Sequence, residues 1–333
     1  MERHPSIVWT PCAAHCIDLM LEDIGKLPWV KTCVEKARNV CKFVYNHSWV
    51  LALMRQYTEH KELARPGITR FATNFITLQS MLRCKMALRR MIVGEEWSSS
   101  SYAATPAGKD MADCIFDERG FWSPCDEIVK FVKPLVVLLR VADGEKPAMG
   151  YIYEGMDRAK EGIKSIYAGD ESKYGPIWQI IDKRWHHQLH RPIHAAAYYL
   201  NPAFHFSPTF RADAEVLDGL YSVMDKMAPV GCTQTDLMRE LQLFSNAQGE
   251  TFSRPITKER VNLLNIEPTK AEVLAITRAQ AKKATYPDPR TETKRVREAR
   301  VEITKEMAAQ GKRCHEATSP SRTKGEERIL WQI

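Results

Sequence analysis

Apolar residues recur at helical spacing over most of the first 250 residues of the chain. A long helical stretch is predicted from Ala13 to Tyr57, with a break near Gly25 and Pro28. The second part of this stretch places one apolar face at Val30, Cys33, Val34, Ala37, Val40, Cys41 and Val44. Such a face is typical of a helix that packs against other elements.

Further helices are predicted along the rest of the body. They cover residues 73–92, 125–141, 149–167, 174–189 and 212–227, and the first carries a stripe of Phe75, Leu78, Leu82 and Met86. Residues 95–108 include four consecutive serines and Pro106, and we expect a polar loop there. Ser6–Thr10 is β-branched and aromatic, which predicts a short strand. The body is therefore expected to be mostly α, with at most one or two strands.

The net charge of +7 changes this picture, because it lies entirely in the last quarter of the chain. Residues 251–333 hold 18 Lys+Arg and 11 Asp+Glu, whereas residues 1–250 hold 30 of each. A basic tail on a neutral body indicates an appended segment, which we expect to be largely disordered or helical, with residues 293–309 as its best helix. Lys282 and Lys283 in this tail are candidate contacts to nucleic acid.

Several classes of protein are disfavoured by composition. The chain is 44% hydrophobic and 27% charged, which argues against disorder throughout. No apolar run has the length of a membrane span, and the N-terminus lacks the order of a signal peptide. Nine scattered cysteines indicate reduced thiols in an intracellular protein. The common Gly-rich nucleotide and hydrolase signatures are missing from the sequence, so no small-molecule substrate is expected.

Cys12 and His15 form the tightest pairing of a thiol with an imidazole. They lie three residues apart at the start of a predicted helix, with Cys16 directly after them. Two such side chains are half of a zinc site, or a nucleophile and its base. The alternative is a packed cysteine beside a hydrogen-bonded histidine, and the sequence leaves all three interpretations open.

Four histidines form the second cluster, His186, His187, His190 and His194. His186 and His190 have the i, i+4 spacing of two ligands on one helical face. The glutamate of the zinc-protease helix is missing, and the charges of Lys183 and Arg191 would repel a cation. We therefore expect no metal site here.

The remaining candidates are weaker. Asp18, Glu22 and Asp23 share one helix, where a solvated face is favoured over a two-metal site. Arg65 and Arg70 border a Pro-Gly turn and either contact phosphate or pair with carboxylates. The tryptophans expected in the core are Trp97, Trp122, Trp178 and Trp185.

Four segments, taken together and in order, resemble the plant hAT superfamily of DNA transposases. They are residues 9–24 (WTPCAAHCIDLMLEDI), 65–73 (RPGITRFAT), 146–153 (KPAMGYIY) and 189–202 (LHRPIHAAAYYLNP). The resemblance runs from about residue 5 to about residue 249. Cys12, His15 and Arg70 are the family-motif residues. Residues 274–283 resemble, more weakly, a linker of retroelement polyproteins.

The resemblance implies a partial ribonuclease-H-like α/β core with a large helical insertion. Residues 1–94 are then the C-terminal part of the core, 95–190 the insertion, 191–250 the return helices toward the core, and 251–333 the basic tail. Intact members of the family hold two Mg²⁺ ions with two aspartates and a glutamate, which support a two-metal displacement.

This chain departs from that pattern, because the family's first two aspartates precede the Cys-x-x-His segment and its glutamate follows the insertion. We therefore expect no catalytic residues, no bound metal and no cofactor, and hence a catalytically inactive remnant truncated at both ends. A domesticated DNA-binding or interaction module is the alternative. The expected partners are DNA, bound weakly, or another transposase-like chain, in the nucleus. Poor solubility of the isolated chain is expected, since the first long helix would expose its apolar face.

Overall fold

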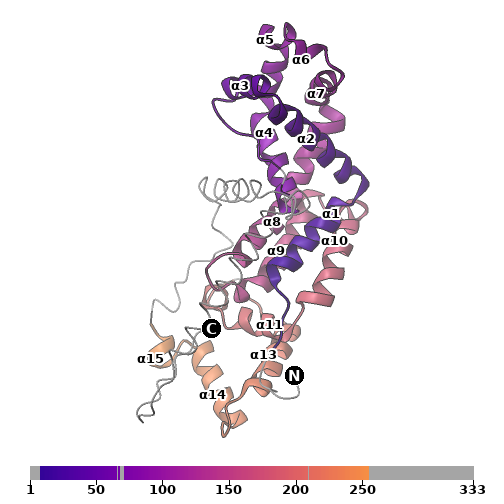
Figure 1. Ribbon diagram of the computed structural model, residues 1–333. Coiled ribbons are helices and arrows are strands. Elements are labelled where there is room, and N and C mark those ends of the chain that lie inside the picture. The colour runs from indigo at the N-terminus through magenta and orange to yellow at the C-terminus, as the bar shows by residue number, and fades with distance from the viewer. Residues whose placement is uncertain (1–7, 66, 68–70, 209, 255–333) are drawn as a thin grey trace, which may run out of the picture. The chain divides into compact units, whose positions relative to one another are not determined.

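A computed structural model of the chain describes residues 8–65, 67, 71–208 and 210–254. This part of the chain is mostly α-helical, as the sequence predicts, and it contains no β-strand (Figure 1). All of it belongs to one compact unit, Met1–Pro268. None of its helices combines the length and apolarity that a membrane crossing requires. The tail, with its predicted helix over 293–309, lies outside the described residues.

The long N-terminal helical stretch consists of three helices, α1 (Ala13–Gly25), α2 (Pro28–Asn46) and α3 (Ser48–Tyr57). Pro28 begins α2 at the position where a missing N–H costs nothing. The apolar face predicted for this stretch is buried in full, together with Phe43. The apolar face of α1 is also buried, so the expected exposure of the first long helix is wrong.

Helix α4 (Ala72–Val93) follows the Pro-Gly turn and is buried over most of its first two turns. Phe75 and Leu78 of its predicted stripe lie in the core, and Leu82 packs against it. Met86 is 66% exposed, however, so the stripe does not continue to the end of the helix. The hydrophobic side of α4 turns instead toward Cys84, Leu88 and Met91.

Residues 95–108 are helical rather than a polar loop, which corrects the prediction. They form α5 (Glu95–Ser98), α6 (Ser101–Ala104) and the start of α7 (Pro106–Phe116). The hydroxyls that suggested a loop are N-caps, because Ser100 accepts a hydrogen bond from the N–H of Ala103 and Thr105 accepts one from Gly108. Trp97 anchors this segment in the core.

The rest of the body alternates long and short helices. They are a π-helical turn η1 (Glu118–Trp122), α8 (Ser123–Ala142), α9 (Met149–Ile166), α10 (Glu171–Arg184), a second π-helical turn η2 (Trp185–Leu189), α11 (Pro192–Tyr199), α12 (Pro202–His205), α13 (Ala214–Met227), α14 (Gln234–Ser245) and α15 (Gly249–Phe252). Trp122 and Trp185 are buried and Trp178 is half-buried, as expected of core residues.

Helix α8 is central to the packing. It contacts α1, α2, α4 and α9, and α9 in turn contacts α11, which packs on α13 (Figure 1). One continuous hydrophobic core results, which includes Phe121, Trp122 and Phe131. Segments distant in sequence, such as α1 and α10, therefore lie side by side.

The strand predicted at the N-terminus is wrong where the structure describes it. Val8, Trp9 and Thr10 lie in coil, and Trp9 is 60% exposed. A strand needs a partner for its backbone groups, and the described part of the chain offers no strand for pairing. Mostly α is therefore the observed class, without an α/β layer among the described residues.

Candidate functional site

The four segments singled out in the sequence provide the starting point, because the fold brings them together in pairs. Residues 9–24 are the chain entering α1 and α1 itself, and 65–73 lead into α4. Residues 146–153 lead into α9, while 189–202 run from η2 through α11 to the start of α12. Direct hydrogen bonds join them in pairs, as follows.

The first pair joins Thr10 to His194, which is 2% exposed. His194 Nδ1–H donates to the Leu189 carbonyl at 2.5 Å, so its Nε2 is the acceptor for the Thr10 hydroxyl at 3.4 Å. Burial lowers the pKa of His194, which keeps the ring neutral. His194 therefore ties η2 and the N-terminal coil together.

The second pair joins α1 to the start of α4. Asp18 Oδ1 accepts a hydrogen bond from the backbone N–H of Ala72 at 3.2 Å. One turn further along α1, Asp23 pairs with Arg184 of α10 at 2.7 Å and with Lys26 at 2.8 Å. Burial alone would raise the pKa of Asp23, but the hydrogen bonds from Lys26 and Arg184 outweigh it and hold the pKa below its usual value.

The third pair joins the segments around Gly150 and Asn201. Asn201 Nδ2 donates to the Gly150 carbonyl at 3.1 Å, while its Oδ1 accepts from the N–H of Ala203 at 3.1 Å and caps α12. A Cβ on residue 150 would lie 2.9 Å from the Ala197 carbonyl. Only glycine permits this close contact between α9 and α11.

Cys12 and His15 are both exposed, at the N-cap and in the first turn of α1, whereas Cys16 is buried. Burial raises the pKa of Cys16. No group of three or more His, Cys, Asp or Glu side chains suited to a metal ion occurs among the described residues. Within residues 8–254 as described, no further ligand therefore accompanies Cys12 and His15.

The four histidines of the second cluster point to different partners. His186 Nδ1–H donates to the Asp182 carbonyl at 2.8 Å and His187 Nδ1–H to that of Lys183 at 2.7 Å. His190 pairs with Glu215 of α13, and His194 is engaged as described above. Of the i, i+4 pair, His186 therefore bonds a carbonyl of its own helix, and His190 contacts α13.

Arg65 is the one candidate nucleic-acid contact that the structure describes. It is exposed, and its guanidinium lies 3.9 Å from the ring centre of Tyr45 on α2. Its partner is thus an aromatic ring, whereas the sequence suggested a phosphate or a carboxylate. Arg70, Lys282 and Lys283 lie outside the described residues.

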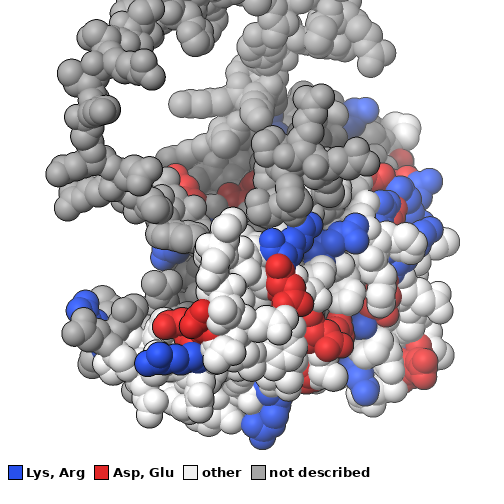
Figure 2. Space-filling model, turned by 90° about the horizontal axis from the view of Figure 1, so that it is seen from below, with Lys and Arg blue, Asp and Glu red and all other residues white. Residues whose placement is uncertain are grey.

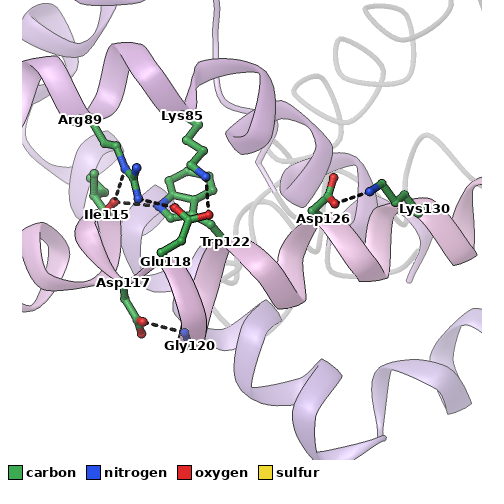
Figure 3. Close-up of polar contacts among 9 residues, drawn as sticks. All are labelled: Lys85, Arg89, Ile115, Asp117, Glu118, Gly120, Trp122, Asp126 and Lys130. Atoms are coloured by element: carbon green, nitrogen blue, oxygen red, sulfur yellow. Dashed lines mark hydrogen bonds and ion pairs between the residues drawn. The ribbon is translucent and has the colours of Figure 1, made fainter. Parts of the chain in front are cut away.

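A second group of basic side chains lies between α4 and η1 and shares one carboxylate (Figure 3). Lys85 and Arg89 pair with Glu118 at 2.8 and 2.7 Å. These hydrogen bonds, led by that from Lys85, hold the pKa of Glu118 below its usual value. The indole of Trp122 lies beneath Lys85 and donates to the Ile115 carbonyl at 2.7 Å. We call Lys85, Arg89 and Glu118 the paired cluster.

Charges of both signs also alternate over the face of the molecule in Figure 2, where blue and red side chains lie next to one another. This agrees with the balanced charge of residues 1–250. On the part of this face that is visible, an anion-binding surface must therefore be local.

Comparison with known proteins adds one finding at the N-terminus. Residues 1–40 match the family model described as a domain of unknown function, DUF659. No curated protein and no solved structure matches the chain. The DUF659 domain is found in plant proteins related to hAT-like transposases, so the first 40 residues, with Cys12, His15 and α1, are similar to part of such proteins.

Proposed function

We propose that this chain is a non-enzymatic helical module derived from a hAT-type DNA transposase, and that it contacts DNA. The observation that carries the proposal is the set of hydrogen bonds between the four transposase-like segments. Thr10 with His194, Asp18 with Ala72, and Asn201 with Gly150 join residues 51 to 184 positions apart. The residues shared with the family thus act as a scaffold.

The use of the α1 carboxylates supports a non-enzymatic role. Asp18 accepts a backbone hydrogen bond, and Asp23 is shared between Arg184 and Lys26. Glu22 pairs with Lys26 as well, at 2.8 Å. Carboxylates that hold two catalytic metal ions converge from separate elements, whereas these three stabilise helix contacts.

We further infer that the described helices correspond to the helical insertion of a ribonuclease-H-like transposase and to the helices that adjoin it. The unbroken succession of helices from α5 to η2, within residues 95–190, supports this assignment. The proposed segment boundaries at residues 94, 190 and 250 follow the same assignment.

A strand-transfer assay tests the absence of catalysis. Purified chain is incubated with duplex DNA and either Mg²⁺ or Mn²⁺, and we expect neither cleavage nor joining. Metal-dependent strand transfer would overturn the proposal. Fluorescence anisotropy with labelled duplex DNA tests the DNA contact, for which we expect affinity that falls with added salt.

The scaffold role is tested at Asn201, which caps α12 and contacts Gly150. Asn201→Ala removes both hydrogen bonds, and we expect the free energy of unfolding to fall by about 1–2 kcal/mol. Asn39→Ala, at an exposed position of α2, is the matched control and should leave stability unchanged. Equal stability of the two variants would show that the Asn201 contacts do not support the fold.

A further inference from the structure

We propose that one face of α2, formed by Arg38, Lys42 and Arg65, binds the phosphodiester backbone of duplex DNA. We call it the α2 basic face. The inference rests on the proposed DNA contact and adds to it a location and a chemistry. The sequence pointed to Arg65 alone among these residues.

Arg38 and Lys42 lie on the solvent side of α2. The core-facing side of the helix carries Val34, Ala37 and Cys41, whereas both basic residues are exposed. They are four residues apart, so one helical turn, or about 6 Å of rise, separates them on the same face. The two cations therefore form a ridge along the helix.

Arg65 extends this ridge from the neighbouring loop. Its guanidinium stacks on Tyr45, the next residue along the same side of α2. The Tyr45 hydroxyl donates to the Leu63 carbonyl at 2.6 Å, which fixes the loop against the helix. Stacking orients a guanidinium without removing its charge, so Arg65 is held ready for an anion.

Arg38 is oriented in a similar way by a neutral partner. Its Nε and Nη2 both donate to Oδ1 of Asn74, at 3.1 and 2.8 Å, and Asn74 is 7% exposed. An amide oxygen accepts the hydrogen bonds but adds no negative charge. Arginine has five N–H donors, so three remain for phosphate oxygens.

Two carboxylates near this face have partners of their own, while Asp110, Asp113 and Asp117 line the same hollow as Lys42. Glu35 lies 4.0 Å from Lys31, and Glu62 accepts from Arg55 at 2.6 Å and from the Tyr45 hydroxyl at 2.8 Å. Within the described part of the chain, no carboxylate forms an ion pair with the three cations of the α2 basic face. Among the described residues, the three cations are therefore outside ion pairs, on a body whose residues 1–250 are neutral as a whole.

The shape of this face favours a linear polyanion over a small one. The three cations follow α2 and an adjoining loop, so successive phosphates of one DNA strand can contact them in turn. Arginine and lysine contacts to phosphate supply affinity without reading bases, so the binding is independent of sequence. An anionic membrane is the competing target, which the experiment includes.

The test uses the full chain and a triple variant, Arg38→Gln, Lys42→Gln and Arg65→Gln. Binding to a labelled 20-base-pair duplex is measured by anisotropy between 50 and 200 mM NaCl, and log Kd is plotted against log salt. Each lost phosphate contact reduces the slope by about 0.9, so we expect the slope of the triple variant to be smaller by about 2.7. The ratio of the affinity of the unmodified chain to that of the variant should therefore be about 40-fold larger at 50 mM NaCl than at 200 mM.

The control is a second triple variant with the same change in net charge at exposed positions elsewhere, Lys109→Gln, Arg119→Gln and Lys164→Gln. It should keep the slope of the unmodified chain. Thermal unfolding of both variants verifies that each is folded. As an independent measurement on the unmodified chain, DNA should protect Lys42 from acylation by an amine-reactive ester.

The outcomes separate this inference from the proposed function. If the unmodified chain binds no DNA, both fail. If it binds and the two variants have equal slopes, or Lys42 is not protected, the DNA contact stands and the α2 basic face is overturned. Loss of binding to vesicles containing phosphatidylserine, with DNA binding unchanged, would assign the face to a membrane instead.

Discussion

The molecule carries two groups of basic side chains that look alike in sequence and differ in the fold. In the paired cluster, Lys85 and Arg89 share the carboxylate of Glu118. On the α2 basic face, Arg38 and Arg65 are held by an amide and an aromatic ring. Both arrangements order the side chains, but the first reduces the positive charge of its two cations by one carboxylate, whereas the partners in the second carry no charge. The chemical nature of the partner therefore decides which cations can bind an external anion.

The largest expected effect concerns the support of the paired cluster. Trp122 is 1% exposed and donates a hydrogen bond to Ile115, and its ring lies beneath Lys85. Trp122→Ala should lower the free energy of unfolding by about 3–5 kcal/mol, since it leaves a large cavity in the core. Urea unfolding measures this loss. Lys109→Gln, on the surface of α7, is the control, and a similar loss there would point to a general fragility of the chain.

A second change tests whether the paired cluster can be converted into a binding surface. Glu118→Gln removes the shared carboxylate while it keeps the shape of the side chain. Two cations are released, so the slope of log Kd against log salt should increase by up to about 1.8. The affinity of the variant relative to the unmodified chain should then change about 12-fold between 50 and 200 mM NaCl. Anisotropy measures the slope, and Glu145→Gln, an exposed residue distant in sequence, is the control. An unchanged slope would contradict the proposed difference between the two groups, because it would show that Glu118 does not prevent Lys85 and Arg89 from binding DNA.

A smaller effect is expected beneath Arg65. Tyr45→Leu removes the ring that carries the guanidinium and the hydrogen bonds to Leu63 and Glu62. The free energy of unfolding should fall by about 1 kcal/mol. DNA affinity should fall as well, since Arg65 loses its fixed orientation. Tyr45→Phe separates the two effects, because it keeps the ring and should keep DNA affinity; a loss of affinity in both variants would make the hydroxyl the important group.

The smallest effect is that of a decrease in pH. It should leave both groups of basic side chains charged but should lower the free energy of unfolding. Burial lowers the pKa of His194 below its usual value of 6.5, and burial lowers that of His205 in the same way. Below about pH 6.5 the unfolded chain binds protons that the folded chain does not, so stability declines as the pH falls through that value. Urea unfolding at pH 7.5 and 5.5 measures this loss of stability. The loss should be smaller in His194→Gln and unchanged in His187→Gln. A larger stability at pH 5.5 would contradict the neutral, buried state of His194.

Helices with a clear apolar period were predicted well. The buried face of α2 is the one that the sequence indicates, and α8, α9 and α13 lie within a few residues of their expected positions. Periodicity reports which side of a helix must be covered, and that information is local. Prediction was wrong for residues 95–108, because Ser100 and Thr105 serve as helix caps and composition does not distinguish a cap from a loop.

The candidate site was predictable only in part. His194, Asn201, Gly150 and Thr10 all lie in segments that the resemblance singled out, but the sequence did not indicate that Thr10 pairs with His194 or Asn201 with Gly150. The i, i+4 and i+7 spacing of Arg38, Lys42 and Tyr45 indicates that they share one side of α2. The same pattern is typical of an ordinary solvated helix face. The role of Asn74 left no such signal, since an asparagine in a helix is common.

The sequence by itself determined the helical class, the sides of the helices that are buried and the neutral charge of residues 1–250. These follow from local periodicity and composition. Tertiary structure alone decided which charges are cancelled, because Lys85 meets Glu118 from 33 residues away and Arg38 meets Asn74 from 36. Electrostatic pairing depends on distances of a few ångströms between groups that the chain separates widely, and those distances exist only after the helices have packed.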